Sequence, residues 1–369
     1  MKKIAFLLIG FILLNSCESD STDTPQSDTF DRTELLINWA DNIIIPYYQN
    51  VDVALSQLRT EAEDFTADPS INSLNNVRES WKAAYLIWQR TAMFEIGPAE
   101  NNDLRLNLNT YPVNATTIEA NINNQNVNLT LPSNRTAKGF GTIDYLLYNE
   151  TTEDDIIAQF STEDGSALRS AYLMQVIDDM QTLINLVKEQ WQNSYRDEFV
   201  GNSGSSATAS VDRFVNDYIF YYEKFLRAGK MGIPLGVFSG NKEPQTLEAF
   251  YEGTLAKELF LEGLDATRDF FNGEHVNETT SGESLYSYLQ ELNELKDGAN
   301  LGDLINDQFD LAFTKVQELD TFKAEIEDND VPNDMLGAYE EVQRLVPLFK
   351  VDMVSAMSIN IDFVDADGD

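Results

Sequence analysis

The chain of 369 residues has one cysteine, Cys17, and one histidine, His275. A single cysteine cannot form a disulfide within the chain, so the folded part must be stable through burial alone. A single histidine excludes a zinc site built on a His-x-x-x-His pair. A Ser-His-Asp triad would have to use His275, which lies in a polar stretch typical of a surface loop, and no Gly-x-Ser-x-Gly segment supports it. The sequence therefore offers no familiar hydrolytic site.

Basic residues are also scarce. The chain has 25 Lys and Arg against 62 Asp and Glu, a formal net charge of −37. An electrostatic field of this sign repels nucleic acid and anionic membrane surfaces, so we expect no nucleic-acid partner. The same charge favours cationic partners, or simply keeps a domain in contact with the outside medium soluble.

The one long apolar run lies at the N-terminus, from Ile4 to Leu14, after two lysines. It is too short to remain as a membrane-spanning helix, and we interpret residues 1–16 as a signal peptide. The spacing Leu14-Asn15-Ser16-Cys17 resembles a bacterial lipoprotein signal, in which the cysteine is lipidated and becomes the mature N-terminus. An ordinary secretory signal with an incidental cysteine is the alternative. We therefore predict a membrane anchor at Cys17 and an outer-membrane lipoprotein of the bacterial cell envelope, facing the periplasm or the cell surface.

The body of the chain has helical periodicity and few strand patterns. Residues 17–31 are polar and are predicted to be a flexible tether. Beyond them apolar residues recur at spacings of three and four, as in Val77, Trp81, Ala84, Tyr85 and Trp88. A Gly- and Ser-rich stretch at residues 201–208 is the best linker signal. The fold is predicted to be all-α, with one helical bundle at residues 32–200 and a second at residues 209–369.

The segment from Gly139 to Tyr148 carries the most specific pattern: Gly139-Phe140-Gly141-Thr142-Ile143-Asp144-Tyr145-Leu146-Leu147-Tyr148. It resembles the signature of the imelysin family, bacterial cell-envelope proteins with a Gly-x-His-x-x-Glu motif followed by an aromatic-Leu-Leu run. Gly141 stands at the histidine position and Asp144 at the glutamate position. An imidazole and a carboxylate three residues apart share a helical face and can share a metal ion, but glycine has no ligand to offer. The resemblance thus implies the imelysin fold and argues against metal-dependent peptidase activity.

Other segments resemble markers of the same family, in order, over residues 31 to 369. Ala92 stands where family members often carry an acidic residue. The matching segments are the stretch from Trp81 and Trp88 to Phe94, Gly97 and Pro98; Asn109-Thr110-Tyr111-Pro112-Val113-Asn114; Gly229-Lys230-Met231-Gly232-Ile233-Pro234-Leu235-Gly236; Glu248-Ala249-Phe250-Tyr251; and the tail from Val351 to Asp369.

Two irregular segments that carry Gly or Pro and resemble family markers are expected to meet in one ligand-binding cleft. The candidate residues of this cleft are Gly139, Gly141, Asp144, Tyr145, Arg135, Tyr111 and Asn114. Asp144 and Glu95 are the candidate metal ligands, and an oxygen-only site would suit iron or calcium better than zinc. Alternatively, Asp144 hydrogen-bonds within the bundle, to Arg135 or to backbone amides of the Asn-rich residues 101–132. No catalytic residue is assigned.

Three functions remain open at this point. The resemblance implies an envelope-anchored, non-catalytic binding protein linked to iron or haem uptake. A metal-dependent peptidase of the imelysin type is the second. A structural or partner-binding surface lipoprotein, with the cleft used for contact with a protein or a glycan, is the third.

Overall fold

A computed structural model of the chain describes residues 30–124, 127–327 and 334–361. The predicted signal peptide, Cys17 and all but the end of the predicted tether lie outside the described residues, as do the last eight residues of the tail. Residues Asp31–Asp369 form one compact unit. In the described ranges, no helix has both the length and the apolar character needed to cross a membrane.

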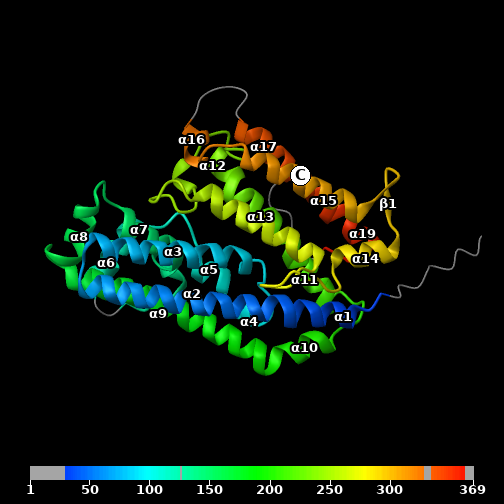
Figure 1. The fold of residues 1–369 in the computed structure, drawn as a ribbon, viewed down its shortest axis with the longest axis horizontal. Helices are drawn as coiled ribbons and strands as arrows, with labels where there is room; N and C mark the ends of the chain where they lie inside the picture. The colour runs from blue at the N-terminus through cyan, green and yellow to red at the C-terminus, as the bar shows by residue number, and fades with distance from the viewer. Residues whose placement is uncertain (1–29, 125–126, 328–333, 362–369) are drawn as a thin grey trace, which may run out of the picture. The chain divides into compact units, whose positions relative to one another are not determined.

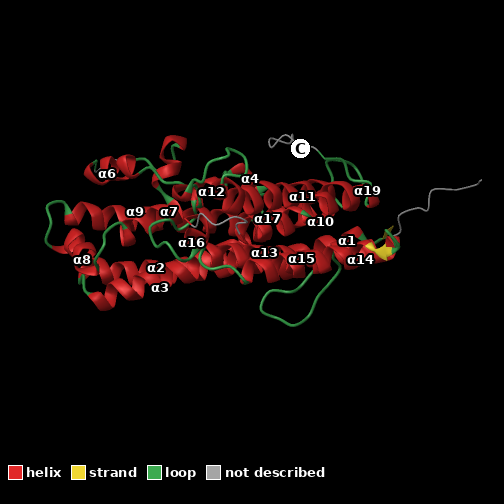
Figure 2. Ribbon diagram, turned by 90° about the horizontal axis from the view of Figure 1, so that it is seen from above, coloured by secondary structure: helices red, strands yellow, loops and turns green. Residues whose placement is uncertain are grey.

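The all-α prediction is confirmed. The regular secondary structure of the described residues is helical apart from one short antiparallel hairpin, β1 (Leu295–Lys296) and β2 (Ala299–Asn300), and one isolated bridge between Glu274 and Ser281 (Figure 2). The helices of the first half are α1 (Arg32–Ile37), α2 (Ile45–Ala67), α3 (Ile71–Thr91), α4 (Pro98–Asn101), α5 (Leu104–Leu108), α6 (Ala115–Asn123), α7 (Gly139–Tyr148), α8 (Glu153–Ser161), α9 (Ser166–Gln190) and α10 (Arg196–Gly201). Those of the second half are α11 (Ser210–Phe220), α12 (Ile233–Leu235), α13 (Ala256–Asn272), α14 (Leu285–Leu292), α15 (Leu301–Gln317), α16 (Phe322–Glu327), α17 (Asp334–Gln343), α18 (Leu345–Pro347) and α19 (Val354–Ala356). Wider π-helical turns cover Asn38–Ile44, Trp191–Tyr195, Tyr221–Gly232 and Leu348–Met353.

Helices α2, α3 and α9 lie side by side and form the long layer of the first half (Figure 1). Their buried residues follow the spacing of three and four that an amphipathic helix needs to bury one face. In α3 these are Leu74, Val77, Trp81, Ala84, Tyr85 and Trp88, which confirms the helix predicted around the two tryptophans. Ser70 caps the start of α3 by accepting a hydrogen bond from the Ser73 amide at 3.3 Å.

Helix α13 connects the two halves of the described unit. It packs against α3 on one side and against α15 on the other, and α15 packs in turn against α17 (Figure 1). Helices from before and after residues 201–208 therefore pack against each other. The division into two bundles at these residues stays a prediction.

Four aromatic rings from distant parts of the sequence meet in the core. Phe270 lies 5.0 Å from Trp39, 5.0 Å from Phe214 and 5.8 Å from Phe94, measured between ring centroids. Tilted and edge-to-face contacts at these distances stabilise a core beyond the area that the rings bury. The cluster therefore joins the π-helical turn Asn38–Ile44, the segment that follows α3, α11 and α13.

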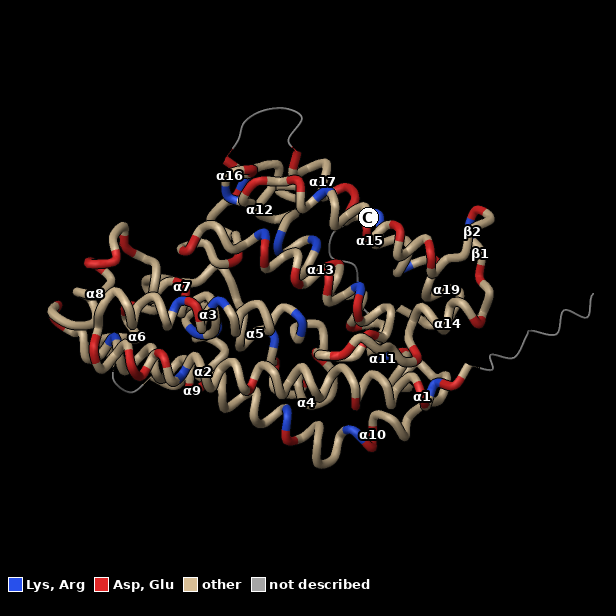
Figure 3. The backbone as a smooth tube through the Cα atoms, in the orientation of Figure 1, with Lys and Arg blue, Asp and Glu red and all other residues tan. Residues whose placement is uncertain are grey.

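Acidic positions outnumber basic ones along most elements of the tube drawing (Figure 3). Several of the basic side chains are tied to more than one carboxylate, as Arg90 is to Glu262, Asp265 and Asp269. Much of the positive charge is thus engaged in ion pairs with the protein's own carboxylates, which leaves an acidic surplus.

Gly139 begins α7 with a φ of +75°, and a Cβ at this position would overlap the carbonyl oxygen of Leu108. Gly165 has a similar φ of +88°, but a Cβ there would meet nothing within 4 Å. We expect Gly165→Ala to lower the free energy of unfolding by about 1 to 2 kcal/mol through backbone strain alone. Gly139→Ala should cost more, about 3 kcal/mol or above, because the overlap adds to the strain. Urea unfolding of both variants measures this, and equal losses would contradict the close approach.

Candidate functional site

Helix α7 is buried on nearly every side, in agreement with its almost continuous apolar sequence. Two contacts fix it against α3. The Trp81 indole donates a hydrogen bond to the Phe140 carbonyl oxygen at 3.1 Å, and the Phe140 ring stacks on Tyr85 with centroids 4.5 Å apart. These two contacts fix the position of the α7 backbone relative to α3.

Asp144 lies in the middle of this helix and is only 2% exposed. Its two carboxylate oxygens accept hydrogen bonds from the backbone amides of Tyr251 and Glu252, both at 2.9 Å. Burial raises the pKa of Asp144 to about 7, although the two amides act in the opposite direction. The alternative role of Asp144, as a hydrogen-bonding residue within the fold, is the one observed, but its partners are not those expected from the sequence. They lie more than a hundred residues away, while Arg135 pairs with Asp103 instead.

A cavity of about 290 Å³ opens beside Asp144. Its walls are mostly aromatic or aliphatic, and Asp144 is the one carboxyl group among them. The lining residues are Tyr111, Pro112, Val113, Gly141, Asp144, Gln245, Leu247, Ala249, Phe250 and Tyr251. Apolar walls with a few polar groups are typical of sites for organic ligands. We call this space the Asp144 cavity.

Gly141 occupies one wall of the Asp144 cavity. A Cβ at this position would lie 2.9 Å from Cγ1 of Val113, closer than carbon atoms normally approach. The space that a side chain at position 141 would need is thus already taken by Val113. Any larger residue at position 141 would have to displace that neighbour.

A buried polar network centred on Lys230 and Glu248 lies next to the wall of the Asp144 cavity. Lys230 and Glu248 form an ion pair that is almost completely buried. Glu248 also accepts hydrogen bonds from the amides of Gln89, at 3.1 Å, and Asn109, at 2.6 Å, and Lys230 donates to Gln89 at 2.8 Å. Burial lowers the pKa of Lys230, and Glu248 acts against this by stabilising its charge. Leu247 and Ala249, on either side of Glu248, line the cavity, so the network fixes its wall.

The structure brings together three of the seven cleft candidates, Tyr111, Gly141 and Asp144, in the Asp144 cavity. The other four lie around it: Gly139 begins the same helix, Tyr145 donates to Glu119 at 2.7 Å, Arg135 is paired with Asp103 at 2.5 Å, and Asn114 accepts from the Thr117 amide at 3.0 Å at the start of α6.

Glu95 lines a different cavity, of about 310 Å³. Its carboxylate accepts the Arg105 amide at 2.9 Å, and Asp217 accepts both the Glu95 amide at 3.0 Å and the Arg105 guanidinium at 3.1 Å. Burial raises the pKa of Glu95 to about 7 and that of Asp217 to about 6, while Arg105 lowers both. These carboxyl groups stabilise Arg105, and Glu95 does not share a cavity with Asp144.

The described residues contain no group of three or more His, Cys, Asp or Glu side chains that could hold a metal ion. At Asp144 both oxygens already accept amide hydrogens, and no second carboxylate lines the cavity. Iron or calcium would therefore lack the set of oxygen ligands that such ions require.

Several residues of the site were not identified from the sequence. Gln245, Leu247 and the amide of Glu252 have no local pattern that indicates a site. The resemblance of Glu248-Ala249-Phe250-Tyr251 to a family marker was the available signal, because this segment supplies both Glu248 of the buried network and Tyr251 beside Asp144.

Comparisons with known proteins agree with the resemblance. The imelysin family model matches residues 44–347 of this chain. Iron-regulated protein A from Synechococcus elongatus is 23% identical over 88 residues, a stretch that spans 24% of this chain and 25% of that relative. The sequence match thus covers about a quarter of the relative's length.

Two crystal structures have the same fold. One is assigned as an iron-regulated protein A precursor from Parabacteroides distasonis, with a TM-score of 0.71 and 16% identity, covering 88% of this chain and 95% of that one. The other is an imelysin-like protein from Psychrobacter arcticum, with a TM-score of 0.69 and 16% identity, covering 90% and 97%. At this level of identity they establish the architecture only.

We expect Lys230→Met to lower the free energy of unfolding by about 3 to 5 kcal/mol, because Glu248 would be left buried without its counter-charge. Lys315→Met removes an exposed pair with Glu318 and should change little. Combining Lys230→Met with Glu248→Gln should recover part of the loss. Chemical unfolding of the variants tests this, and a loss no larger than that of the Lys315 variant would contradict the buried pair.

The raised pKa of Asp144 predicts a pH dependence of stability. A carboxyl group whose pKa is higher in the folded than in the unfolded protein stabilises the fold below its unfolded pKa, and this stabilisation disappears as the pH rises through the folded value. Between pH 5 and pH 8 the Asp144 contribution should fall by about 2 to 3 kcal/mol. Asp144→Asn should therefore show a smaller fall over this range than the unmodified protein. Parallel unfolding curves at both pH values measure it, and identical falls would disprove the assignment.

Proposed function

This chain belongs to the imelysin family, and on that premise we propose that it is a ligand-binding protein of the bacterial cell envelope, linked to iron or haem uptake, rather than a metal-dependent peptidase. One observation carries the proposal: both oxygens of the Asp144 carboxylate are held by backbone amides at the edge of an apolar cavity. This arrangement fixes the wall of a binding site, and no second carboxylate lines the cavity.

Peptide hydrolysis by a metal ion needs protein ligands that leave one coordination position open for water. Gly141 supplies no ligand, and Val113 occupies the space beside it. Asp144 is the one carboxyl group that lines the cavity, so a metal ion beside it would have a single carboxylate ligand in an apolar site. These three features support binding without hydrolysis.

The walls of the Asp144 cavity suit an organic ligand with a flat apolar part. Tyr111, Phe250 and Tyr251 offer ring faces and edges, and Pro112 and Val113 complete the rim. At about 290 Å³ the cavity is at the lower limit of common ligand sites, so it would enclose one edge of a ligand as large as haem. The names of the relatives, which refer to iron regulation, support a ligand of iron or haem uptake over other apolar compounds.

The envelope location of this function is supported by the N-terminal sequence. A short apolar segment followed by Leu14-Asn15-Ser16-Cys17 is the pattern on which lipidation and anchoring depend. A polar tether after the anchor would leave the compact unit free to meet a ligand in the medium.

Titration of the full chain with haemin, with ferric citrate and with calcium chloride tests the proposal. We expect saturable binding of haemin, seen as a change in its absorbance spectrum, and weaker or no binding of the two metal salts. Val113→Trp would fill the mouth of the Asp144 cavity and should weaken haemin binding about tenfold or more, which corresponds to about 1.4 kcal/mol.

Val351→Trp is the matched control, because Val351 is 60% exposed and lies outside the cavity. It should leave haemin binding unchanged. Failure of all three compounds to bind would overturn the proposal. Chelator-sensitive cleavage of a protein substrate that is lost in Asp144→Ala would replace it with the peptidase.

A further inference from the structure

A cavity larger than the Asp144 cavity lies between α2, α3, α13 and the segment that follows α13. It measures about 800 Å³. One part of its wall is aliphatic and comes from α2 and α3, including Val53, whose side chain is 69% exposed. The other part is charged and comes from α3, α13 and residues 274–278. We call it the α2–α3–α13 groove.

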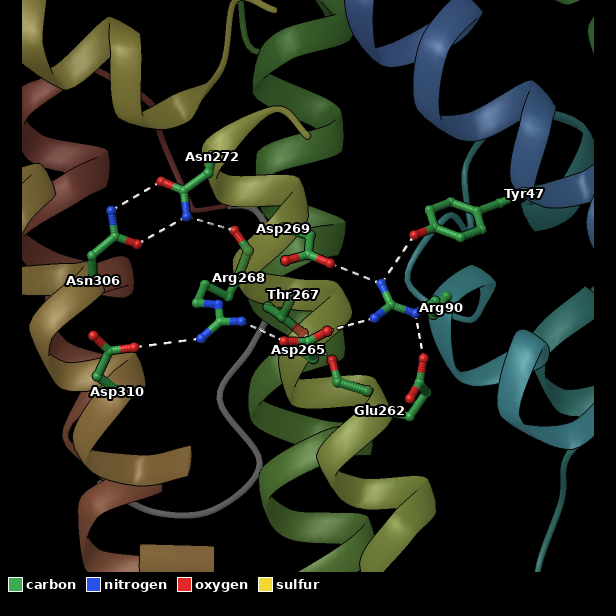
Figure 4. Close-up of polar contacts among 11 residues, drawn as sticks. Tyr47, Arg90, Glu262, Asp265, Thr267, Arg268, Asp269, Asn272, Asn306 and Asp310 are labelled. Atoms are coloured by element: carbon green, nitrogen blue, oxygen red, sulfur yellow. Dashed lines mark hydrogen bonds and ion pairs between the residues drawn. The ribbon is translucent and has the colours of Figure 1, made fainter. Parts of the chain in front are cut away.

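Arg90 stands in the charged part but is not available to bind an anion. Its guanidinium group is paired with Glu262, with Asp265 at 2.5 Å and with Asp269 at 2.8 Å, and it also donates to the Tyr47 hydroxyl at 3.1 Å (Figure 4). The three acids are spaced by three and four residues along α13, so they present one face to Arg90. Asp265 is also paired with Arg268 on its other side, at 2.5 Å, so two guanidinium groups face these three carboxylates (Figure 4). Their sum still leaves this end of the groove negative by one formal charge.

The groove lining carries further negative charge. Four carboxylates, those of Glu262, Asp269, Glu274 and Glu278, and one guanidinium group line it, which gives a formal charge of −3 with His275 neutral. Among the described residues, no ion pair or hydrogen bond engages the carboxylate of Glu274. The groove therefore has charge available for an incoming cation, next to an apolar surface that a hydrocarbon chain could cover.

His275 adds a hydrogen-bond acceptor to the same wall. The Thr280 hydroxyl donates to the Glu278 carboxylate at 2.9 Å, because that carboxylate can only accept. The Thr280 oxygen must then accept from Nδ1 of His275, which lies 2.9 Å away. In the neutral ring this leaves Nε2 as an acceptor, and Nε2 is buried without a hydrogen-bond partner in the described residues. His275 is thus not the solvated loop residue that its sequence suggested, since its side chain is only 18% exposed.

We propose that the α2–α3–α13 groove is a second binding site and that it takes an organic cation with N–H donors on an apolar stem, that is, an alkylammonium or alkylguanidinium group. The charged head lies near Glu274, Glu278 and Nε2 of His275, and the stem covers the aliphatic wall of Val53 and Ile87. This chemistry is offered by a free amine or by a lysine or arginine side chain of another protein.

The test uses the full chain and n-hexylamine, which is a cation at neutral pH, in calorimetric titration and in ligand-observed NMR. We expect saturable binding at least about tenfold tighter than that of n-hexanol, and none of n-hexanoate. Hexyltrimethylammonium has the same charge but no N–H donor, and it should bind severalfold more weakly than n-hexylamine. A blocked lysine derivative measured in parallel decides between a free amine and a protein side chain as the source of the head group.

Two variants probe the two parts of the groove. The pair Glu274→Gln and Glu278→Gln should weaken n-hexylamine binding about fivefold or more, and Val53→Ser should weaken it through the stem. Glu189→Gln, on the exposed side of α9, is the matched control and should have no effect. The Val113→Trp variant of the other cavity should also bind n-hexylamine normally, which separates the two proposals. Equal binding of the amine and the carboxylate, or binding that the groove variants do not change, would overturn this one.

Discussion

The candidate site depends on how residues 247–252 are held by two buried carboxyl groups, those of Glu248 and Asp144. On one side, Glu248 reaches into the core to Lys230, Gln89 and Asn109. On the other, the carboxyl group of Asp144 accepts hydrogen bonds from the backbone amides of Tyr251 and Glu252. A buried carboxyl group is tolerated only when its hydrogen bonds or its charge are satisfied. Loss of either contact would therefore lower the free energy of unfolding. Together they give the Asp144 cavity a rigid wall without regular secondary structure.

The same argument explains why the family motif can change here while the fold remains. A histidine at position 141 would need space that Val113 occupies, and Asp144 is the one carboxyl group that lines the cavity beside it. In this chain, Gly141 packs against Val113, and Asp144 accepts hydrogen bonds from two backbone amides. The scaffold keeps the cavity, and its lining is mostly aromatic and aliphatic with one carboxyl group.

The two cavities differ in the kind of ligand they suit. The Asp144 cavity is small and aromatic, with its one carboxyl group already engaged. The α2–α3–α13 groove is larger and negatively charged, with Glu274 and Nε2 of His275 free of partners among the described residues. This division follows from the charge of the chain: with so few basic residues, most cations are consumed by buried or multiple ion pairs, and the surfaces left over are acidic.

The sequence by itself determined the helical class and the positions of the main helices, because the spacing of residues such as Trp81 and Trp88 is a local property of the chain. It also indicated the family, through the segment from Gly139 to Tyr148. Only the tertiary structure decided which groups meet. The partners of Asp144, the pairing of Lys230 with Glu248 and the setting of His275 each join segments whose approach is governed by long-range packing. No local spacing encodes those contacts, and for that reason they could not be read from the chain.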